Sequence, residues 1–228
     1  SALGALLAQQ TKSQRHRPIM NHWIAPMSLS GQHVQLVPLS HEHRDDLAEA
    51  VRDGDLWNHW YTAIPTPEGM AAEITRRLDL QAKGSMCPFA VIDPATGQAV
   101  GMTTFMNIDA ANRRVEIGST WYRQSVQRTP LNTQAKRLLL AHAFEHLNCI
   151  AVEFRTHFFN QQSRRAIERL GAKLDGVLRS HQINPHPLGA GALRDTCVYS
   201  IIASEWPNVR THLDFQLSRA RTEEPRSC

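Results

Sequence analysis

Apolar and polar residues alternate with two different periods along this 228-residue chain, and each period predicts a different kind of element. Alternation with a period of two predicts strands over residues 33–39, 89–93, 99–108, 115–122, 150–158, 173–182 and 195–202. Apolar residues spaced three and four apart predict helices over residues 41–54, 68–82, 132–147 and 160–170, and a last helix capped by Ser204. This order predicts a mixed sheet with helices on its faces, an α/β or α+β architecture.

The strongest helical pattern covers residues 132–147, and we expect Asn132 or Thr133 to be its N-cap. A polar loop separates this helix from the strand over residues 115–122. That strand is the third of three joined by short turns, which predicts antiparallel pairing among them.

Composition indicates a folded globular protein, because 42% of residues are hydrophobic and 20% are charged. No apolar run approaches the roughly 18 residues of a membrane span, so no membrane partner is expected. The 25 Lys and Arg residues exceed the 21 Asp and Glu residues only slightly and form no block. Charge therefore does not indicate nucleic-acid binding.

The cysteines are scattered and suggest neither a disulfide framework nor a metal site. Cys87, Cys149, Cys197 and Cys228 form no C-x-x-C pair and have no histidine at metal-ligand spacing. We therefore expect reduced thiols, a cytoplasmic location and no metal.

The two ends of the chain have weaker patterns than the middle. Residues 1–20 carry a short apolar run followed by a basic stretch, the reverse of signal-peptide order, and we expect a flexible extension or a remnant of cloning there. Residues 21–219 fit one domain of ordinary size, and residues 220–228 are expected to be a disordered tail.

The junction of strand, loop and helix between Trp121 and Phe144 is the most informative region. The first N–H groups of a helix lack intrahelical partners and the helix dipole is positive there, so such a junction can hold a pyrophosphate. Arg123 and Arg128 add positive charge. Most junctions of this kind bind nothing, however, and a surface arginine is usually only solvated, so both interpretations stay open at this point.

Motifs in and around this junction resemble one family. The run Gln127-Arg128-Thr129-Pro130-Leu131-Asn132 stands where GNAT acetyltransferases carry their Q/R-x-x-G-x-G/A coenzyme loop, and Glu116-Ile117-Gly118 resembles the preceding strand of the RimJ/RimL-like branch. Residues 160–172 resemble that branch's N-x-x-S-x-x-A-x-x-x-x-G motif, and residues 176–179 and 194–196 resemble its closing strands. The chain is therefore similar to RimJ/RimL-like GNAT N-acetyltransferases over most of its length.

The resemblance implies a GNAT fold, in which a mixed, mostly antiparallel sheet flanked by helices splays between its fourth and fifth strands, here residues 115–122 and 150–158. It also implies acetyl-CoA as cosubstrate, with the pantetheine along the splay and the pyrophosphate on the loop before the long helix. The coenzyme-binding residues that it implies are Tyr122, Arg123, Arg128, Thr129, Leu131, Asn132, Thr133, Asn160 and Ser163.

The loop departs from the family pattern at both glycine-type positions. Pro130 removes an N–H donor and Asn132 adds a Cβ to a crowded turn, so the phosphate cradle must be built differently or bind less tightly. The hydroxyl of Thr129 and the amide of Asn132 are candidate substitute donors. The alternative is that Asn132 is only an N-cap.

Acetyl transfer needs a neutral amine, stabilisation of charge on the thioester oxygen and a proton for the departing thiolate. Glu116 is the candidate base, and period-two alternation predicts that it shares a strand face with Gly118 and Thr120. The alternative is an exposed carboxylate that pairs with Arg113 or Arg114.

The other two roles fall to a backbone group and a hydroxyl. A backbone N–H near Tyr122 is the candidate to polarise the thioester. The Tyr that many GNAT enzymes carry seven residues after the motif Asn is Ile167 here, so Ser163 is the first candidate acid and Tyr122 the second. The alternatives are that Ser163 is an ordinary first-turn residue and that Asn160, rather than binding pantetheine, only caps its helix.

Three residues are candidates for binding the acceptor. Trp57 and Trp60 lie in a region that varies with the acceptor in this family, and Arg179 lies on a closing strand. Core aromatics and an ordinary surface charge are the alternative interpretations.

The predicted function is transfer of acetyl from acetyl-CoA to a primary amine, by direct attack in a ternary complex and without a metal. The acceptor is a small molecule or a protein N-terminus, and the last helix and the N-terminal arm are candidate elements for a homodimer. The alternatives are a CoA-binding protein without turnover and a nucleic-acid-associated module.

Overall fold

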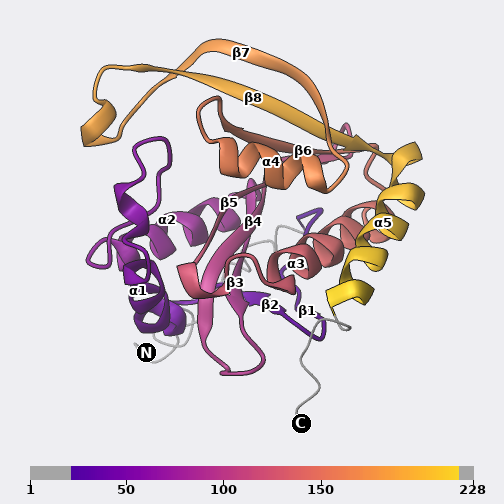
Figure 1. Cartoon of the computed structure of the whole chain (residues 1–228), viewed down its shortest axis with the longest axis horizontal. Helices are drawn as coiled ribbons and strands as arrows, with labels where there is room; N and C mark the ends of the chain where they lie inside the picture. Colours follow the sequence, from indigo (N-terminus) through magenta and orange to yellow (C-terminus); the bar gives the residue numbers. More distant parts are fainter. Residues whose placement is uncertain (1–21, 221–228) are drawn as a thin grey trace, which may run out of the picture.

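The computed structural model describes residues 22–220, which form an eight-stranded sheet with helices on both faces (Figure 1). The strands are β1 (Leu29–Ser30), β2 (Gln35–Pro38), β3 (Met86–Ile92), β4 (Ala99–Asp109), β5 (Arg114–Tyr122), β6 (Ala151–His157), β7 (Lys173–Ile183) and β8 (Leu193–Ile202). Their order is β1-β2-β3-β4-β5-β6-β8-β7, and only the pair of β5 and β6 is parallel. The mixed, mostly antiparallel sheet expected from the sequence is confirmed.

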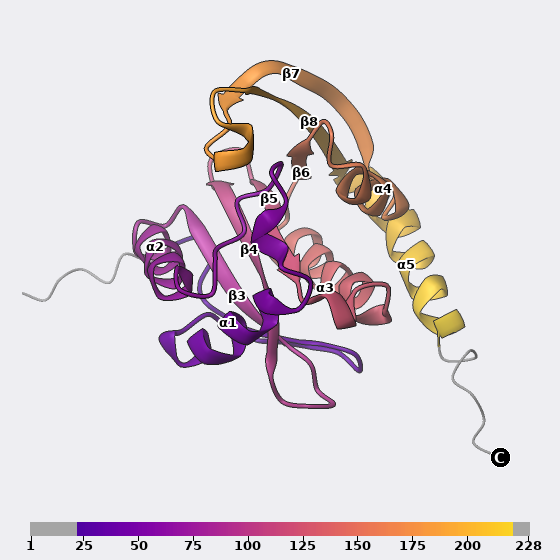
Figure 2. The same ribbon diagram turned by 60° about the vertical axis from the view of Figure 1, so that its left-hand side comes forward.

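The helices form a layer on each face of the sheet. They are α1 (Arg44–Arg52), α2 (Met70–Ala82), α3 (Pro130–Ala141), α4 (Gln161–Arg169) and α5 (Trp206–Ala220). Helices α1 and α2 cover one face and bury Met102 and Trp121, whereas α3, α4 and α5 cover the other and bury Phe105 and Phe154 (Figure 2). Both faces are apolar because each is covered.

The sheet opens between β5 and β6. Their parallel pairing extends only from Arg114 with Ala151 to Glu116 with Glu153, although β5 runs on to Tyr122. The two strands therefore separate over their second halves. This splay is the one expected between the fourth and fifth predicted strands.

A bulge at Ser119 interrupts β5 where the splay begins. Thr104 of β4 pairs with Gly118 and Met102 pairs with Trp121. Two residues of β5, Ser119 and Thr120, therefore lie opposite the single residue Thr103 of β4. Ser119 has φ of 47°, in the left-handed region. One extra residue in a strand is a β-bulge, which bends the strand and re-aims the side chains after it.

The bulge overturns one expectation about the strand faces. Glu116 and Gly118 do share a face, since a Cβ on Gly118 would lie 2.9 Å from Glu116 Oε1. Thr120 instead contacts Lys136 of α3, on the opposite face of the sheet. The prediction that Thr120 shares the face of Glu116 was wrong, because the extra residue shifts the alternation by one position.

Helix α3 starts earlier than the sequence suggested. It begins at Pro130 and is capped by Thr129, so the prediction of Asn132 or Thr133 as N-cap was wrong. Proline suits the first helical position, where no intrahelical N–H bond is lost. The end of the predicted helix, His142–His146, is a π-helical turn.

Other boundaries differ by a few residues. Strand β1 has only two residues, too few for a periodic signal. Ser204 lies inside a 3-10 turn, Ala203–Glu205, and does not cap α5. No helix within residues 22–220 is long and apolar enough to cross a membrane. The predicted extension at residues 1–20 and most of the predicted tail lie outside the described residues.

Candidate active site

The loop between β5 and α3 is anchored at its start by Asp53, the residue that follows α1. Asp53 Oδ2 accepts hydrogen bonds from Ser125 N and Arg123 Nε, both at 3.0 Å. Bonds from Ser125 and then Arg123 hold the pKa of Asp53 below its ordinary value, although burial opposes them. Arg123, an expected coenzyme ligand, is therefore engaged in an ion pair that shapes the loop.

The loop ends at the capped start of α3. Thr129 Oγ1 accepts a hydrogen bond from Leu131 N at 3.4 Å and donates to Val126 O at 2.6 Å. The Leu131 side chain is buried in the core, so it has no atoms to offer a ligand beyond its backbone. The N–H of Thr133 reaches the carbonyl of the capping Thr129, four residues earlier, so helix geometry leaves only the N–H group of Asn132 in this turn without a partner. This amide forms the anion-binding end of the helix.

The two positions that are glycine-like in the family lie inside this helix rather than in a turn. Pro130 is its first residue and Asn132 its third. The left-handed conformation in the loop belongs instead to Arg128, with φ of 65°. Asn132 Oδ1 is buried and has no hydrogen-bond partner among the described residues. Asn132 is therefore not the cap of this helix, a role that Thr129 fills.

A hollow of about 330 Å³ opens between this loop and the start of α4. Its lining residues are Gly54, Leu56, His59, Gln124, Gln127, Arg128 and Gln162. Gln162 Nε2 donates to Gln127 Oε1 at 3.4 Å, and Gln127 Nε2 donates to Tyr122 O at 2.9 Å. The end of β5 and the start of α4 are thus bridged by two glutamine side chains across the mouth of the splay.

Tyr122 faces the splay with its backbone and the core with its ring. Trp121 O lies beside Gly101 of β4, and Arg123 N donates to Val100 O at 2.8 Å, so the backbone groups of Tyr122 between them point away from β4. The ring belongs to the core under α3, and burial raises the pKa of its hydroxyl. This placement fits the expected backbone role of Tyr122 but not its second role as an acid.

The start of α4 is fixed by its cap. Asn160 Oδ1 accepts a hydrogen bond from Ser163 N at 3.1 Å, so Asn160 caps the helix. Ser163 lies in the first turn of α4, next to Gln162 and the hollow. Both residues therefore lie at the start of α4, where the neighbouring Gln162 contacts Gln127 of the loop before α3.

Glu116 lies in β5 at the last residue paired with β6. It is only 5% exposed, and its Oε2 accepts a hydrogen bond from Asn107 Nδ2 at 2.5 Å. Burial raises the pKa of this carboxyl above its ordinary value. The alternative of an exposed carboxylate paired with Arg113 or Arg114 was wrong, because Arg114 pairs instead with Glu153 at 2.8 Å.

Charged side chains on β6 and β8 surround Glu116. The positive charges of Arg155 and Arg194 lower the pKa of Glu116, and the negative charge of Glu153 raises it, all by less than burial does. Arg155 also pairs with Glu153 at 3.3 Å. A buried carboxyl with a raised pKa beside a splayed strand is suited to accept a proton near neutral pH.

Aromatic residues border the same face beyond the end of β6. The Trp60 ring lies 5.0 Å from that of His157 and 6.0 Å from that of Phe159. His157 Nδ1 accepts from Phe159 N, which leaves its proton on Nε2, a buried atom without a partner among the described residues. Trp57 packs instead against the core under α1 and α2, so the interpretation as a core aromatic holds for it.

Arg179 lies on the β7–β8 hairpin, and its side chain is 81% exposed. Its Nε donates to Asp195 Oδ2 at 2.7 Å, and both residues line an open hollow of about 560 Å³ with Phe158, Phe159 and Leu193. The bond from Ser180 N and then that from Arg179 hold the pKa of Asp195 below its ordinary value. This hollow is the larger of the two described here, and it adjoins Trp60 through Phe159.

The thiols of Cys87, Cys149 and Cys197 are free and buried. Burial raises the pKa of Cys87 to about 12 and that of Cys149 to about 11. These cysteines are therefore protonated and poor nucleophiles. Among residues 22–220, no group of three or more His, Cys, Asp or Glu side chains is arranged to hold a metal ion.

Two buried cations near the splay were not identified as candidate site residues from the sequence. Arg77 of α2 is 3% exposed and Lys136 of α3 is 6% exposed. Each occupies the apolar stripe of its helix, Arg77 seven residues after Met70 and Lys136 three before Leu139. A charged residue at a core position of a helix is the signal that would have found them.

Comparison with known proteins gives one family. A family model described as an acetyltransferase (GNAT) domain matches residues 33–173. The chain is 33% identical to a GCN5-related N-acetyltransferase from Brucella melitensis, with a TM-score of 0.74 over 85% of this chain and 86% of that one. It also resembles in fold the Mycobacterium smegmatis RimJ in complex with CoA-disulfide, at 20% identity and a TM-score of 0.71 over 85% and 96% of the two chains.

A curated relative is the Bacillus subtilis (strain 168) protein YdaF, whose name provisionally describes a ribosomal N-acetyltransferase. The two are 32% identical over 111 residues. The match covers 48% of this chain and 57% of that protein, so the chain spans little more than half the length of this relative.

Proposed function

The chain belongs to the GNAT acetyltransferase family, and on that basis we propose that it transfers the acetyl group of acetyl-CoA to a primary amine. One observation carries the proposal. The strand that bears the buried Glu116 separates from β6 directly after that residue, and its far end meets the starts of α3 and α4. A coenzyme-binding opening and a candidate base therefore lie on one strand.

The residues around the opening suit a coenzyme with a pyrophosphate and amide groups. The free N–H group of Asn132 at the start of α3 would hold the pyrophosphate, with Arg128 beside it. The carbonyl of Tyr122 accepts an amide N–H from Gln127, so it is positioned to accept one from a pantetheine instead. The buried Asn132 Oδ1, in the first turn of α3, has no hydrogen-bond partner among the described residues and would accept an N–H or O–H group of the coenzyme.

In the proposed reaction, the ionised Glu116 takes a proton from the incoming ammonium, and the resulting amine attacks the thioester carbonyl. A C–N bond forms as the carbonyl oxygen gains negative charge, which the backbone N–H of Tyr122 stabilises. The attacking nitrogen then gives its second proton to water as the C–S bond breaks. The CoA thiolate takes a proton from the Ser163 hydroxyl, which takes one from water in turn. Glu116 returns its proton to water after the product leaves.

We propose direct attack within a ternary complex, without a covalent acyl-enzyme. Cys87, Cys149 and Cys197 are buried, and burial raises the pKa of each thiol. Thiols in this state are poor nucleophiles.

We further propose that the acceptor is the α-amine of a protein. The hollow beside Arg179 and Phe159 is open and wide, which suits an extended chain better than a small molecule that must be enclosed. YdaF carries a name of the same acceptor class, and so does a RimL structure described as a ribosomal L7/L12 α-N-protein acetyltransferase. The second of these, at 18% identity, supports only the common fold.

A thiol-release assay with acetyl-CoA tests the proposal. The acceptors are a set of small amines and a set of peptides with free N-termini, with N-terminally blocked versions of the same peptides as controls. We expect turnover with free peptides and none with blocked ones. Turnover with small amines alone would refute the protein acceptor, and CoA binding without turnover would favour the alternative of a CoA-binding protein.

A further inference from the structure

The bulge at Ser119 determines which backbone groups of β5 face the splay. Beyond it, Trp121 turns its backbone towards β4 and Tyr122 turns its backbone towards the opening. If β5 paired regularly with β4, a shift of one residue would exchange these two orientations. The backbone groups that the proposed function assigns to coenzyme and thioester would then bond to β4 instead.

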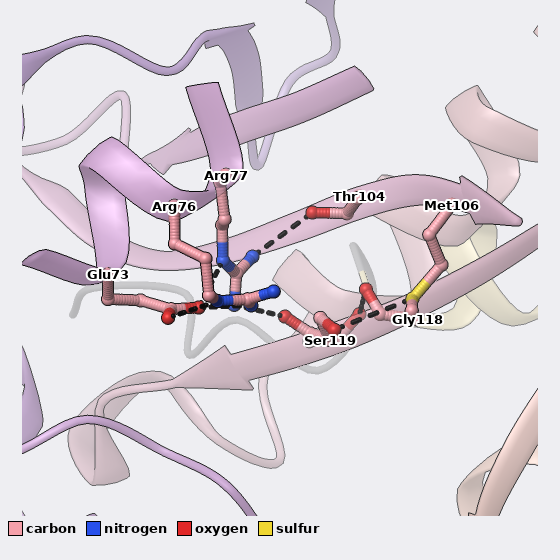
Figure 3. A network of polar contacts seen from close by, with 8 residues as sticks. Glu73, Arg76, Arg77, Thr104, Met106, Gly118 and Ser119 are labelled. Atoms are coloured by element: carbon pink, nitrogen blue, oxygen red, sulfur yellow. Dashed lines mark hydrogen bonds and ion pairs between the residues drawn. The ribbon is translucent and has the colours of Figure 1, made fainter. Parts of the chain in front are cut away.

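Arg77 of α2 holds the bulge from one face of the sheet (Figure 3). Its Nη2 donates to Ser119 O at 3.0 Å and its Nη1 donates to Thr104 Oγ1 of β4 at 3.0 Å. Its Nε donates to Glu73 Oε1 at 2.8 Å. One guanidinium thus joins the left-handed residue of β5 to the strand opposite it, which a planar fork of donors can do and a single ammonium cannot.

Glu73 in turn fixes the guanidinium. It accepts two hydrogen bonds from Arg76, each at 2.8 Å, in addition to the bond from Arg77. Burial raises the pKa of Glu73, but the bonds and charges of Arg76 and Arg77 outweigh it, so the pKa lies below its ordinary value. The carboxylate therefore stays ionised and compensates the buried charge of Arg77.

Lys136 of α3 holds the next residue from the opposite face. Its Nζ donates to Thr120 Oγ1 at 3.3 Å and lies 6.0 Å from the centre of the Tyr122 ring. The Thr120 hydroxyl also shares a 2.8 Å hydrogen bond with Thr103 Oγ1 of β4. Burying an ammonium without a nearby carboxylate is costly, and burial lowers the pKa of Lys136 to about 7. A cation kept at such a position usually has a role beyond packing.

We infer that Arg77 and Lys136 are positioning residues for acyl transfer, two cations that hold Ser119 and Thr120 from opposite faces of the sheet. We call this pair the bulge clamp. It keeps the backbone of Tyr122 turned to the splay, and so it acts on coenzyme and thioester without touching either. The inference rests on the proposed function.

The test compares Arg77→Met and Lys136→Met with two control variants. Arg76→Met removes an exposed neighbour that shares Glu73 but does not touch the bulge, and Arg137→Met removes a cation of α3 that pairs with Asp214. Calorimetry gives the Kd for CoA, and initial rates give kcat and the KM for each substrate. Thermal unfolding sets a temperature at which every variant is folded.

We expect each clamp variant to bind CoA more weakly and to have a kcat about 100-fold lower, because a misplacement of about 1 Å in the reacting geometry costs about that much in rate. The KM for acetyl-CoA should rise in parallel, while the KM for the amine and all constants of the two controls stay within about twofold of wild type. A clamp variant that is less stable but keeps the wild-type Kd and kcat would overturn the inference, since the cation would then be merely structural.

Arg77→Lys provides a second variant if Arg77→Met does not fold. It keeps the charge beside Glu73 but cannot reach both Thr104 and Ser119, so weak CoA binding should persist. Restoration of the wild-type Kd by Lys would contradict the clamp. If wild-type protein does not bind CoA, the proposed function fails and the inference fails with it, whereas equal binding by wild type and variants refutes the inference alone.

Discussion

Replacing Glu116 with Gln tests the proposed role of this residue as general base with little change in the shape of the side chain. The side chain is 5% exposed and accepts a hydrogen bond from Asn107, and a Gln oxygen can accept the same bond. The substitution removes the negative charge and the ability to take a proton, and it keeps the shape of the side chain and this hydrogen bond. Removal of a general base lowers kcat about 10²- to 10⁴-fold, which corresponds to roughly 3 to 5 kcal/mol of activation free energy.

The same substitution should not destabilise the protein. Burial raises the folded-state pKa of Glu116, so the fold favours the protonated carboxyl. Its favourable contribution is complete below the unfolded pKa and is lost as the pH rises through the folded pKa. At pH about 7 the buried, ionised carboxylate lowers the free energy of unfolding. Glu116→Gln should therefore have a free energy of unfolding equal to or above that of wild type.

Steady-state rates and urea denaturation over a range of pH measure both effects. In wild type, kcat/KM should rise with pH through the raised pKa of Glu116, and this acidic limb should be missing in Glu116→Gln. Glu153→Gln is the matched control. It removes a neighbouring negative charge that raises the pKa of Glu116, so the acidic limb should move to lower pH while turnover persists. Near-normal kcat in Glu116→Gln, or an unchanged acidic limb, would refute the assignment of Glu116 as base.

Three further substitutions probe the loop and helix α3. Thr129→Ala removes the cap and should lower the free energy of unfolding by about 1 kcal/mol in urea denaturation, and an unchanged value would show that the cap contributes nothing. Asn132→Ala should weaken CoA binding about tenfold in calorimetry, the effect of one hydrogen bond to a charged group, and unchanged affinity would remove the amide from the cradle. Burial lowers the pKa of Lys136 to about 7, so between about pH 7 and 9.5 the unfolded chain binds more protons at this residue than the folded one. The free energy of unfolding of wild type should therefore rise relative to Lys136→Met across that range, and parallel pH dependences of the two proteins would contradict the lowered pKa.

The spacing of apolar residues predicted most helices and strands, because these elements are long enough for the spacing to repeat. The hairpin of β7 and β8 and its connecting loop were predicted almost to the residue, since strong turn signals flank the loop. The start of α3 was missed because Pro130 and Thr129 were assigned to a family loop, although proline followed by a helical pattern is itself a start signal.

The site was less predictable than the fold. Nothing in the residue type of Ser119 indicates a left-handed bulge, because serine carries none of the conformational preference of glycine. The burial of Glu116 depends on the β6 and β8 side chains that surround it, which no local pattern contains. Arg77 and Lys136 were visible as charges on apolar stripes, but their partners across the sheet come from distant parts of the sequence.

Hydrogen exchange with and without CoA tests most directly whether the coenzyme binds in the splay between β5 and β6. The amide of Tyr122 faces the opening, and that of Asn132 lies in the first turn of α3 without an intrahelical partner. We predict that saturating CoA slows exchange in the peptides that contain these two residues and leaves those from the far strands β1 and β2 unchanged. CoA that does not bind, or that binds and protects only other segments, would contradict the assignment.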